Sequence, residues 1–380
     1  MAKLGEICAF QSGGTPSKNK PEYFGGEIPW ISTTALNGGK INKADAVAWI
    51  TPKAIRESAA KIVPANSIMV GTRVGIGKVA INTVEMSTSQ DVISLINIDE
   101  DKWYKPYLCK LLLSKKDYFN SQARGATIKG IKIDVVANID VPEIDYATQR
   151  KVAATLNKID TLIVLRKQQL EKLDELVKAR FVEMFGDPVK NTMDWEIKPL
   201  SELGELNRGV SKARPRNSPE LLGGPYPLIQ TGEVANAKTY ITSFNSTYSE
   251  KGLAQSKMWP KGTLCITIAA NIAQTSILTF DACFPDSVVG FISRNMTNEL
   301  FIHYWFSFFQ KILDEQAPQV AQKNINLKIL SELNVIVPPL SLQNRFAAFV
   351  ERVDQQKQSV QQSLEKLELV KKVLMQEYFG

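Results

Sequence analysis

The chain repeats itself, and this repeat constrains its fold more than any other feature of the sequence. When the 380-residue sequence is compared with itself at an offset of 194, Gln149–Gly186 aligns with Gln343–Gly380, and thirteen of 38 positions are identical. Offsets of 196 to 198 align the strand-like and turn residues before them, with few identical side chains. The sequence therefore predicts two copies of one scaffold, in which a variable block precedes a better matched helix.

The two matched segments have the pattern of long helices with one apolar face. Gln149–Phe185 contains neither proline nor glycine, and its apolar residues alternate in spacings of three and four, which is typical of a heptad seam. Charged residues interrupt the seam at Arg166, and at Lys357 and Lys371 in the second copy. Because a lone helix cannot bury such a stripe, we expect the two helices to pair as an antiparallel coiled coil with pseudo-two-fold symmetry. The alternative is that each helix packs separately on its own block.

Each block has the pattern of a mixed α+β fold. In residues 1–148, segments rich in β-branched and apolar residues are separated by glycine-rich turns, and a helical pattern follows. Residues 187–342 repeat this order. We predict strands at Ser67–Val70, Val79–Ile81, Val92–Ile98, Thr263–Ile268, Ser276–Phe280 and Val288–Ile292, and helices at Tyr107–Asn120 and Glu299–Asp314.

Composition and cysteine usage narrow the class of protein. This length corresponds to two or three domains, and 44% hydrophobic with 22% charged residues is ordinary for a globular protein. No apolar run approaches the roughly 18 residues of a membrane span, and no apolar signal core follows the first residues. The four cysteines are widely separated, so we expect reduced, mostly buried thiols in a cytoplasmic protein. A net charge of +7 permits an anionic partner without requiring one.

Two features that suggest catalysis do not meet its requirements. Gly71–Lys78 resembles a phosphate-binding loop, but it has one residue too many before Gly-Lys, and Val79 stands where a hydroxyl would bind magnesium. A dinucleotide motif would need a helix next, whereas the pattern here indicates a strand. His303, the single histidine, lies in an apolar helical pattern and is expected to be a core residue. We find no carboxylate pair or methyltransferase signature, so the sequence predicts no catalytic residue, metal or cofactor.

The repeated layout closely resembles the specificity subunit of type I restriction–modification systems, over essentially the whole chain. The resemblance rests on the order of several features, which occurs twice. The chain departs from the family at Thr148 and Leu342, where a glutamate is usual before the glutamine. The matching features are Val141-Pro142 and Val337-Pro338-Pro339, then Gln149 and Gln343, Asp160 and Asp354, the two Leu-Glu-Lys-Leu stretches, both Phe-Gly ends, and the polar loops Gly125–Lys132 and Gln319–Asn326.

This resemblance implies a DNA-binding subunit without catalytic activity of its own. In the family, two target-recognition domains alternate with two helical spacers; here the domains would be 1–148 and 187–342, and the spacers 149–186 and 343–380. The implied partners are double-stranded DNA, two methyltransferase subunits and restriction subunits, with no membrane. Each domain would read one half of an asymmetric, two-part site, and the helices would set the gap between the halves. Two unlike faces suit unlike half-sites, whereas identical dimers read palindromes.

Candidate DNA contacts are the polar and basic side chains of turns at matched scaffold positions. Lysine and arginine position a protein on phosphates, while asparagine, glutamine and arginine read base edges. The candidates in the first block are Thr15, Ser17, Lys18, Arg73, Lys78, Gln90, Lys129 and Lys132. The candidates in the second block are Arg208, Lys212, Arg214, Arg216, Gln230, Asn271, Gln274, Lys323 and Asn324.

Two other functions stay open on the sequence. A tandem adaptor that binds proteins through its coiled coil, without reading DNA, would show the same repeat. An ordered complex that ignores DNA would favour that function. A nucleotide-dependent enzyme would require nucleotide binding near Gly71–Lys78, against the argument above.

Overall fold

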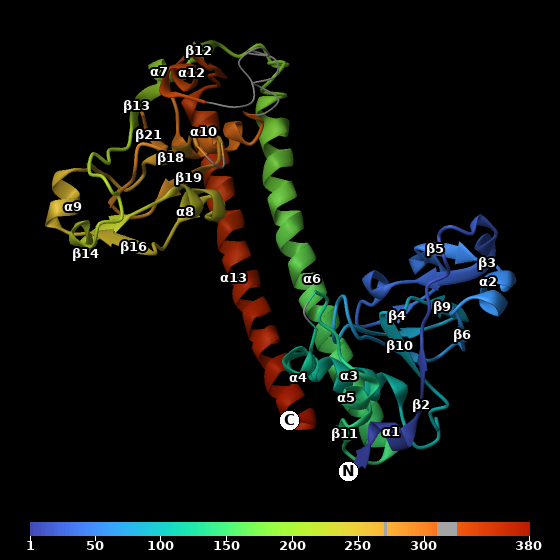
Figure 1. The fold of residues 1–380 in the computed structure, drawn as a ribbon. Coiled ribbons are helices and arrows are strands. Elements are labelled where there is room, and N and C mark those ends of the chain that lie inside the picture. Colours follow the sequence, from blue (N-terminus) through green and yellow to red (C-terminus); the bar gives the residue numbers. More distant parts are fainter. Residues whose placement is uncertain (126, 270–271, 310–324) are drawn as a thin grey trace. The chain divides into compact units, whose positions relative to one another are not determined.

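The computed structural model describes residues 1–125, 127–269, 272–309 and 325–380 (Figure 1). The chain divides into two compact units. Unit 1 comprises Met1–Lys167 and Gln362–Gly380, and unit 2 comprises Gln168–Gln361. The two long helices, α6 (Tyr146–Phe185) and α13 (Leu340–Phe379), therefore each contribute one end to each unit.

Unit 1 contains two sheets and a two-stranded pair. Its strands are β1 (Ala2–Lys3), β2 (Ala9–Ser12), β3 (Phe24–Ile31), β4 (Lys40–Ile41), β5 (Ala48–Ile50), β6 (Ile62–Val63), β7 (Ile68–Gly71), β8 (Val79–Asn82), β9 (Met86–Thr88), β10 (Val92–Ile96) and β11 (Asp140–Val141). Its shorter helices are α1 (Leu4–Ile7), α2 (Pro52–Glu57), α3 (Lys105–Ser114), α4 (Lys116–Gln122) and α5 (Ile133–Ala137). The strand orders are β2-β10-β7-β8-β4, β5-β3-β9-β6 and β1-β11.

Unit 2 repeats the strands of unit 1 in the same sequence order, with short helices among them. Its strands are β12 (Ile197–Pro199), β13 (Gly204–Arg208), β14 (Leu222–Leu228), β15 (Tyr240–Ile241), β16 (Ser246–Tyr248), β17 (Met258–Trp259), β18 (Leu264–Thr267), β19 (Thr275–Leu278), β20 (Ala282–Cys283), β21 (Val288–Ser293) and β22 (Asn334–Ile336). Its shorter helices are α7 (Leu200–Leu203), α8 (Thr231–Asn236), α9 (Glu250–Ala254), α10 (Glu299–Phe306) and α12 (Leu327–Glu332). The strand orders are β13-β21-β18-β19-β15, β16-β14-β20-β17 and β12-β22.

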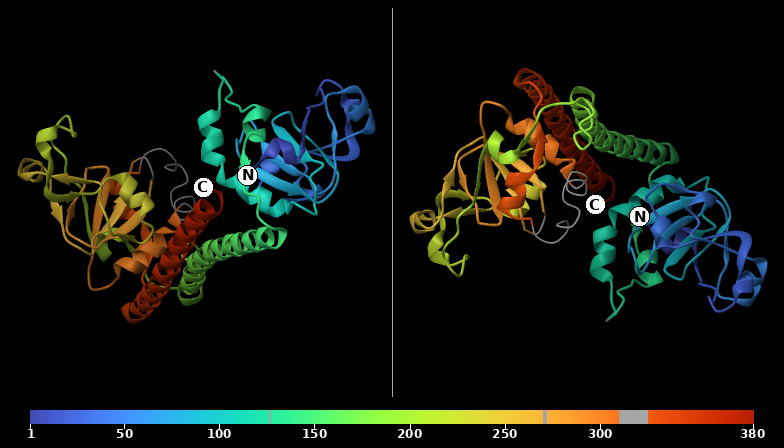
Figure 2. Two further views of the ribbon diagram at one scale, coloured as in Figure 1. Left: turned by 90° about the horizontal axis from the view of Figure 1, so that it is seen from below. Right: turned by 90° about the horizontal axis from the view of Figure 1, so that it is seen from above.

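The topologies of the two units confirm the predicted duplication and the α+β class. Strand by strand, the five-stranded order of unit 2 repeats that of unit 1, and so does the four-stranded order. In each unit the four-stranded sheet lies on the side away from the long helices (Figures 1 and 2). The five-stranded sheet is therefore the layer between the small sheet and the helices.

The predicted strands are confirmed, but the two helices predicted within the blocks have different bounds in the structure. β7, β8, β18 and β19 are buried at every residue, as expected from their apolar and β-branched side chains. The helix expected at Tyr107–Asn120 is two helices, because Lys115 has φ −89° and ψ 11° between α3 and α4. The helix expected at Glu299–Asp314 ends at Phe306, where tighter turns follow: the amide of Ser307 donates to the Tyr304 carbonyl (3.1 Å). Residues 310–314 of that prediction lie outside the described residues.

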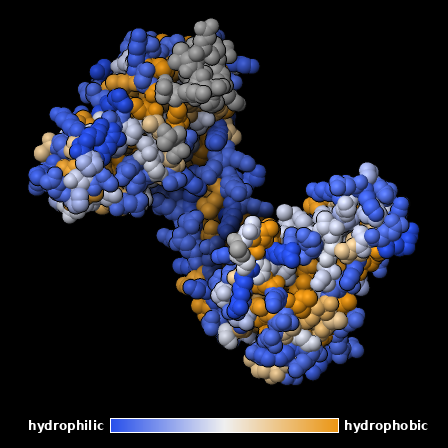
Figure 3. Space-filling view, in the orientation of Figure 1, coloured by the Kyte–Doolittle hydropathy of each residue, from blue (hydrophilic) through white to orange (hydrophobic). Residues whose placement is uncertain are grey.

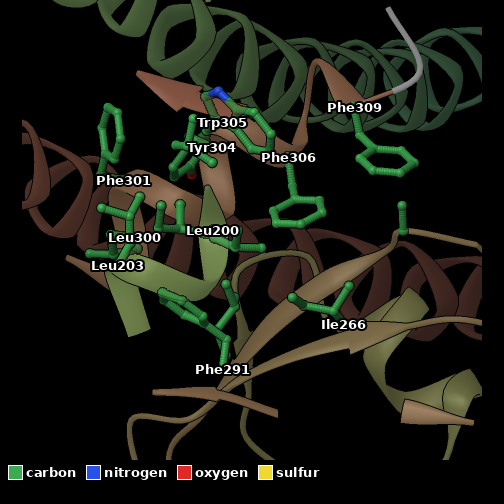
Figure 4. Packing of buried hydrophobic residues seen from close by; sticks show 14 of the residues in the cluster. Leu200, Leu203, Ile266, Phe291, Leu300, Phe301, Tyr304, Trp305, Phe306 and Phe309 are labelled. Carbon is green, nitrogen blue, oxygen red and sulfur yellow. The ribbon is translucent and has the colours of Figure 1, made fainter. Parts of the chain in front are cut away.

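The core of unit 2 joins its five-stranded sheet to the helices. Phe301 and Trp305 of α10 are fully buried in it, together with Phe291 of β21 and Ile266 of β18. Figure 4 shows these side chains between the sheet and the helical layer. Both long helices contribute to the same cluster, with Phe181 from α6 and with residues of α13. The globular part of unit 2 and its helix ends therefore share one core.

In each unit, the ends of α6 and α13 run antiparallel to each other. In unit 1, Asp160 and Lys167 of α6 pair with Lys371 and Glu368 of α13 (2.6 and 3.2 Å). In unit 2, Asp174 of α6 pairs with Lys357 of α13 (2.7 Å), and the rings of Phe181 and Phe346 lie 5.4 Å apart between centroids. Residue numbers rise along α6 as they fall along α13, which confirms antiparallel pairing. The alternative, in which each helix packs only on its own block, is wrong.

The two lysines that interrupt the apolar seam of α13 hold ion pairs across it. Lys371 and Lys110 of α3 both contact the carboxylate of Asp160 (2.6 and 2.7 Å). These two ammonium groups lower the pKa of Asp160 even though its burial acts in the opposite direction. Lys357 contacts Asp174 and Asp354 (2.7 and 3.2 Å). A charged residue at a seam position favours one register of the helices, because any other register would leave the charge unpaired.

One buried glutamine at the start of each long helix fastens that helix to its block. In unit 1, the Gln149 amide accepts from the Tyr104 amide (2.8 Å) and donates to the carbonyls of Lys102 and Ile144 (3.0 and 2.9 Å). Gln343, at the matched position of unit 2, donates to the carbonyls of Met296 and Pro338 (3.1 and 2.8 Å). The identity of these two residues in the repeat therefore has a structural cause.

Replacing Gln343 by leucine is expected to lower the free energy of unfolding by about 2–3 kcal/mol, because several buried polar groups would lose their partner. These groups are the carbonyls above and the amide of Asn298, which donates to Gln343 Oε1 (3.1 Å). Urea unfolding of the full chain measures the change. Gln356→Leu, at an exposed position of the same helix, is the control and should change stability by less than about 0.5 kcal/mol. Equal effects of the two substitutions would contradict the fastening role.

Candidate functional site

In unit 1, the ends of four strands bring three turns to one edge of the five-stranded sheet. β10 is antiparallel to β2 and β7, and β7 is antiparallel to β8, so β2 and β7 end where β10 and β8 begin. The amide of Gly13 donates to the Val92 carbonyl (3.0 Å), and that of Thr72 donates to the Asp91 carbonyl (2.8 Å). Six candidates lie in these turns and are exposed: Thr15, Ser17, Lys18, Arg73, Lys78 and Gln90.

The turn between β7 and β8 is tightly closed. The amide of Gly77 donates to the Gly71 carbonyl (3.0 Å), and the amide of Lys78 donates to the Gly75 carbonyl (3.1 Å). Gly75 and Gly77 both have φ +73°, a conformation that side chains other than glycine rarely adopt. The glycines of the apparent phosphate-binding motif are thus explained by turn geometry, and β8 follows as predicted instead of a helix.

A fourth turn brings the remaining two candidates of unit 1 to the same edge. Arg124 and Gly130 exchange backbone hydrogen bonds (2.9 Å each), and the amide of Ile131 donates to the Thr72 carbonyl (2.8 Å). Lys129 and Lys132 flank this contact and are exposed. We call the described residues of 13–18, 72–78, 89–91 and 124–132 edge 1.

Unit 2 repeats this arrangement with different side chains. β13 and β18 end where β21 and β19 begin. The amide of Gly209 donates to the Val288 carbonyl (2.8 Å), and the amide of Ile268 donates to the Ser287 carbonyl (3.0 Å), as Gly13 and Thr72 do in unit 1. The exposed candidates here are Arg208, Lys212, Arg214, Arg216 and Gln274. We call the described residues of 208–218, 268–274 and 285–287 edge 2.

Asp286 organises the arginines of edge 2. Its carboxylate accepts from Arg216 Nη2 (2.6 Å) and lies 4.0 Å from Arg214 Nη2, while its carbonyl accepts from Arg208 Nε (2.9 Å). On edge 1, Arg73 Nη1 lies 3.7 Å from the carboxylate of Asp91. Exposed ion pairs contribute little stability, so a bound phosphate or base can replace the aspartate as partner. The sequence reasoning missed both aspartates, although each stands just before a buried strand.

Of the remaining candidates of unit 2, the structure describes only Gln230. Gln230, just before α8, is exposed and lines a cleft of about 180 Å³ with Arg216, Ser211 and Tyr248. Edge 2 therefore extends toward the four-stranded sheet at this cleft. Three candidates, Asn271, Lys323 and Asn324, lie outside the described residues.

His303 has the environment of a packed residue. Its Nδ1 lies 2.9 Å from Thr275 Oγ1, and the ring stacks edge-on against Tyr304, with centroids 4.9 Å apart. Burial, and secondarily the positive charge of Lys357, lowers the pKa of His303 to about 4. The ring is half-buried and borders a cavity of about 490 Å³, so it lies at the margin of the core. With a pKa of about 4 the ring is neutral near pH 7, and its described side-chain hydrogen bond is to a threonine hydroxyl, which supports the structural role expected from the sequence.

The cysteines and acidic residues do not form a reactive centre in the described part of the chain. All four cysteines are free, and Cys109, Cys265 and Cys283 are buried. Burial raises the pKa of the Cys109 thiol to about 12, far from a reactive thiolate. Within the ranges that the structure describes, no three His, Cys, Asp or Glu side chains are grouped as a metal site would require. Nor does any described helix combine the length and apolarity that crossing a membrane requires.

Comparison with protein families finds one match over most of the chain. The model of the type I restriction modification DNA specificity domain matches residues 1–175 and 192–369. The specificity subunit of the type I restriction enzyme MjaIX from Methanocaldococcus jannaschii is 29% identical over 227 residues, which are 55% of this chain and 52% of that protein. The EcoR124I/EcoR124II specificity subunit from Escherichia coli is 29% identical over 192 residues, 46% of each chain. The match thus spans about half the length of these curated relatives.

Solved structures with a similar fold cover the chain more fully. A chain from a structural study of complex assembly and conformational transition in the type I R-M system has a TM-score of 0.64 and 18% identity, covering 100% of this chain and 96% of that one. The type I restriction-modification S subunit from M. genitalium has a TM-score of 0.58 and 16% identity, covering 100% and 95%. At these identities the similarity concerns the fold alone.

Proposed function

The chain belongs to the family of the type I restriction modification DNA specificity domain, as the sequence predicted, and we propose that it is the sequence-reading, non-catalytic subunit of a DNA-modifying complex. Edge 1 and edge 2 would each read one half of an asymmetric, two-part DNA site. The helices would set the number of unread base pairs between the halves.

One observation carries this proposal: every candidate that the structure describes is exposed, and most candidates of each unit gather at equivalent strand ends. Both edges combine cations with amide or hydroxyl side chains, which suits phosphate positioning together with base reading. The equivalent turns hold different residues, such as Gly77 in unit 1 and Ala273 in unit 2, whose amides make the same bond. A conserved frame with variable side chains supports two reading surfaces of unlike specificity.

The long helices support the proposal that protein partners bind there. Apolar side chains on both helices are exposed, including Leu165 and Leu369 in unit 1 (52% and 62%) and Leu176 in unit 2 (47%). Because the two units repeat one scaffold, we propose that two methyltransferase subunits dock on them and that restriction subunits join for cleavage. We propose residues 1–148 and 187–342 as the reading domains and 149–186 and 343–380 as the spacers.

The test compares DNA molecules in a complex of this chain with its methyltransferase partners. The DNA bound from a random pool would be selected, sequenced and measured against random DNA at moderate salt. We expect the selected DNA to contain two short fixed blocks and to bind at least about 1,000-fold more tightly. Equal binding of both DNAs by an ordered complex would instead favour the protein adaptor.

Two neighbouring substitutions on edge 1 separate phosphate contact from base reading. Lys78→Ala is expected to weaken binding to all sequences alike and to reduce the salt slope by about one. Arg73→Ala is expected to cost about 1–3 kcal/mol and to relax the preference at one base pair. Binding titrations at several salt concentrations, with the selected site and its single-base variants, measure both effects. If Arg73→Ala left the preference at each position unchanged, Arg73 would contact only phosphate.

A further inference from the structure

Two of the most exposed apolar side chains of unit 1 stand among the cations of edge 1. Val74 is 59% and Ile128 is 63% exposed. Hydrophobic patches lie between hydrophilic areas on the visible face of unit 1 (Figure 3). Single exposed apolar residues are common and need no explanation. Val74 and Ile128 differ because the described residues beside each of them make backbone hydrogen bonds or close contacts.

The turn of Val74 is fixed against the helical layer. It is closed by the two hydrogen bonds of Gly77 and Lys78 described above. A Cβ at Gly77 would lie 3.1 Å from Lys116 and 3.3 Å from Phe119, so this turn packs closely on α4. Val74 is therefore held at the surface by the turn itself.

The turn of Ile128 packs against that of Val74. Besides the hydrogen bond from Ile131 to Thr72, a Cβ at Gly130 would lie 3.0 Å from Cγ of Arg73. Gly125 has φ +138°, and a Cβ there would lie 2.3 Å from the Ile128 carbonyl. Two closed turns in contact present one valine and one isoleucine, flanked by Arg73 and Lys129.

We propose that Val74 and Ile128 contact thymine methyl groups in the major groove of the half-site that edge 1 reads. This inference rests on the proposed function. Phosphates and base edges offer polar partners to the surrounding cations, whereas the C5 methyl of thymine is the apolar group that the major groove presents. Two turns side by side fit a groove about 12 Å wide better than the minor groove of about 6 Å. Val74 and Ile128 are thus specificity-determining residues that prefer A·T pairs.

The experiment replaces thymine by deoxyuridine, which removes only the methyl group. With the full chain in its methyltransferase complex, each thymine of the selected half-site is replaced in turn and binding is titrated. We expect one or two replacements to weaken binding by about threefold to tenfold, the value of one buried methyl group. In Val74→Ala or Ile128→Ala, replacing the thymine that the removed side chain contacts should no longer weaken binding. Val47→Ala removes a similarly exposed valine (54%) of unit 1 that lies outside edge 1 and the long helices, and this variant should still bind the deoxyuridine DNA more weakly.

The outcomes distinguish this inference from the proposed function. If the unaltered complex shows no sequence preference, the proposed function fails. If it selects a site but binds thymine and deoxyuridine DNA equally, only the methyl contact is overturned. The methyl contact would also be overturned if the alanine variants bound thymine DNA and deoxyuridine DNA with the same loss of affinity. That result would indicate an apolar wedge in the minor groove, where the thymine methyl group is not exposed. Unchanged thermal melting shows that the variants fold.

Discussion

Replacing Phe181 by alanine is expected to lower the free energy of unfolding of unit 2 by about 3–5 kcal/mol. Phe181 is fully buried, and its ring centroid lies 4.9–5.6 Å from those of Phe185, Phe301, Phe308 and Phe346. These rings come from α6, the α10 region and α13, so one truncation opens a cavity where three helical segments meet. Urea unfolding followed by tryptophan fluorescence measures the loss, because Trp305 lies in the same cluster.

The neighbouring residue provides the control for this stability loss. Val182 follows Phe181 on α6 but is 41% exposed, so Val182→Ala should change the free energy of unfolding by less than about 0.5 kcal/mol. A loss below about 1 kcal/mol for Phe181→Ala would mean that the helix ends contribute little to the core of unit 2. The shared core described above would then be a weak contact.

Adding one heptad to both long helices is expected to lengthen the tolerated gap in the DNA site by about three base pairs. Seven residues add about 10.5 Å at 1.5 Å per residue, and a base pair spans about 3.4 Å. The insertions belong between Lys167 and Gln168 in α6 and between Gln361 and Gln362 in α13, where the two units divide. A whole heptad in each helix preserves the seam on both sides of the insertion. Binding to a series of DNAs with different gaps measures the change.

An insertion in α6 alone is the matched control. The ion pairs Asp160–Lys371 and Asp174–Lys357 lie on opposite sides of the insertion. After an insertion in α6 alone, no single register of the two helices can therefore form both pairs. We expect it to lower binding at every gap length. If the double insertion left the preferred gap unchanged while binding persisted, the helices would not set the spacing, although DNA reading by the two edges would stand.

The sequence predicted the strands and turns that carry the candidate site, but not which side chains from distant segments meet there. It located the turn at Gly71–Lys78 and rejected a nucleotide loop there, because the strand pattern of the next residues is local information. It did not indicate that Asp286 binds Arg216, a residue 70 positions away. That pairing depends on β13 and β21 lying side by side, which the strand patterns alone do not specify. The base contacts themselves stay predictions.

The sequence by itself determined the duplication, the long helices and their apolar seam, because heptad spacing and the repeat are visible along one dimension. It also marked Lys357 and Lys371 as interruptions of that seam. Only the tertiary structure decided that these lysines pair with Asp174 and Asp160, and that distant turns meet at one edge of each sheet. The physical reason is that periodicity sets which face of an element is buried, whereas its neighbours follow from strand order and from the pairing of buried charges.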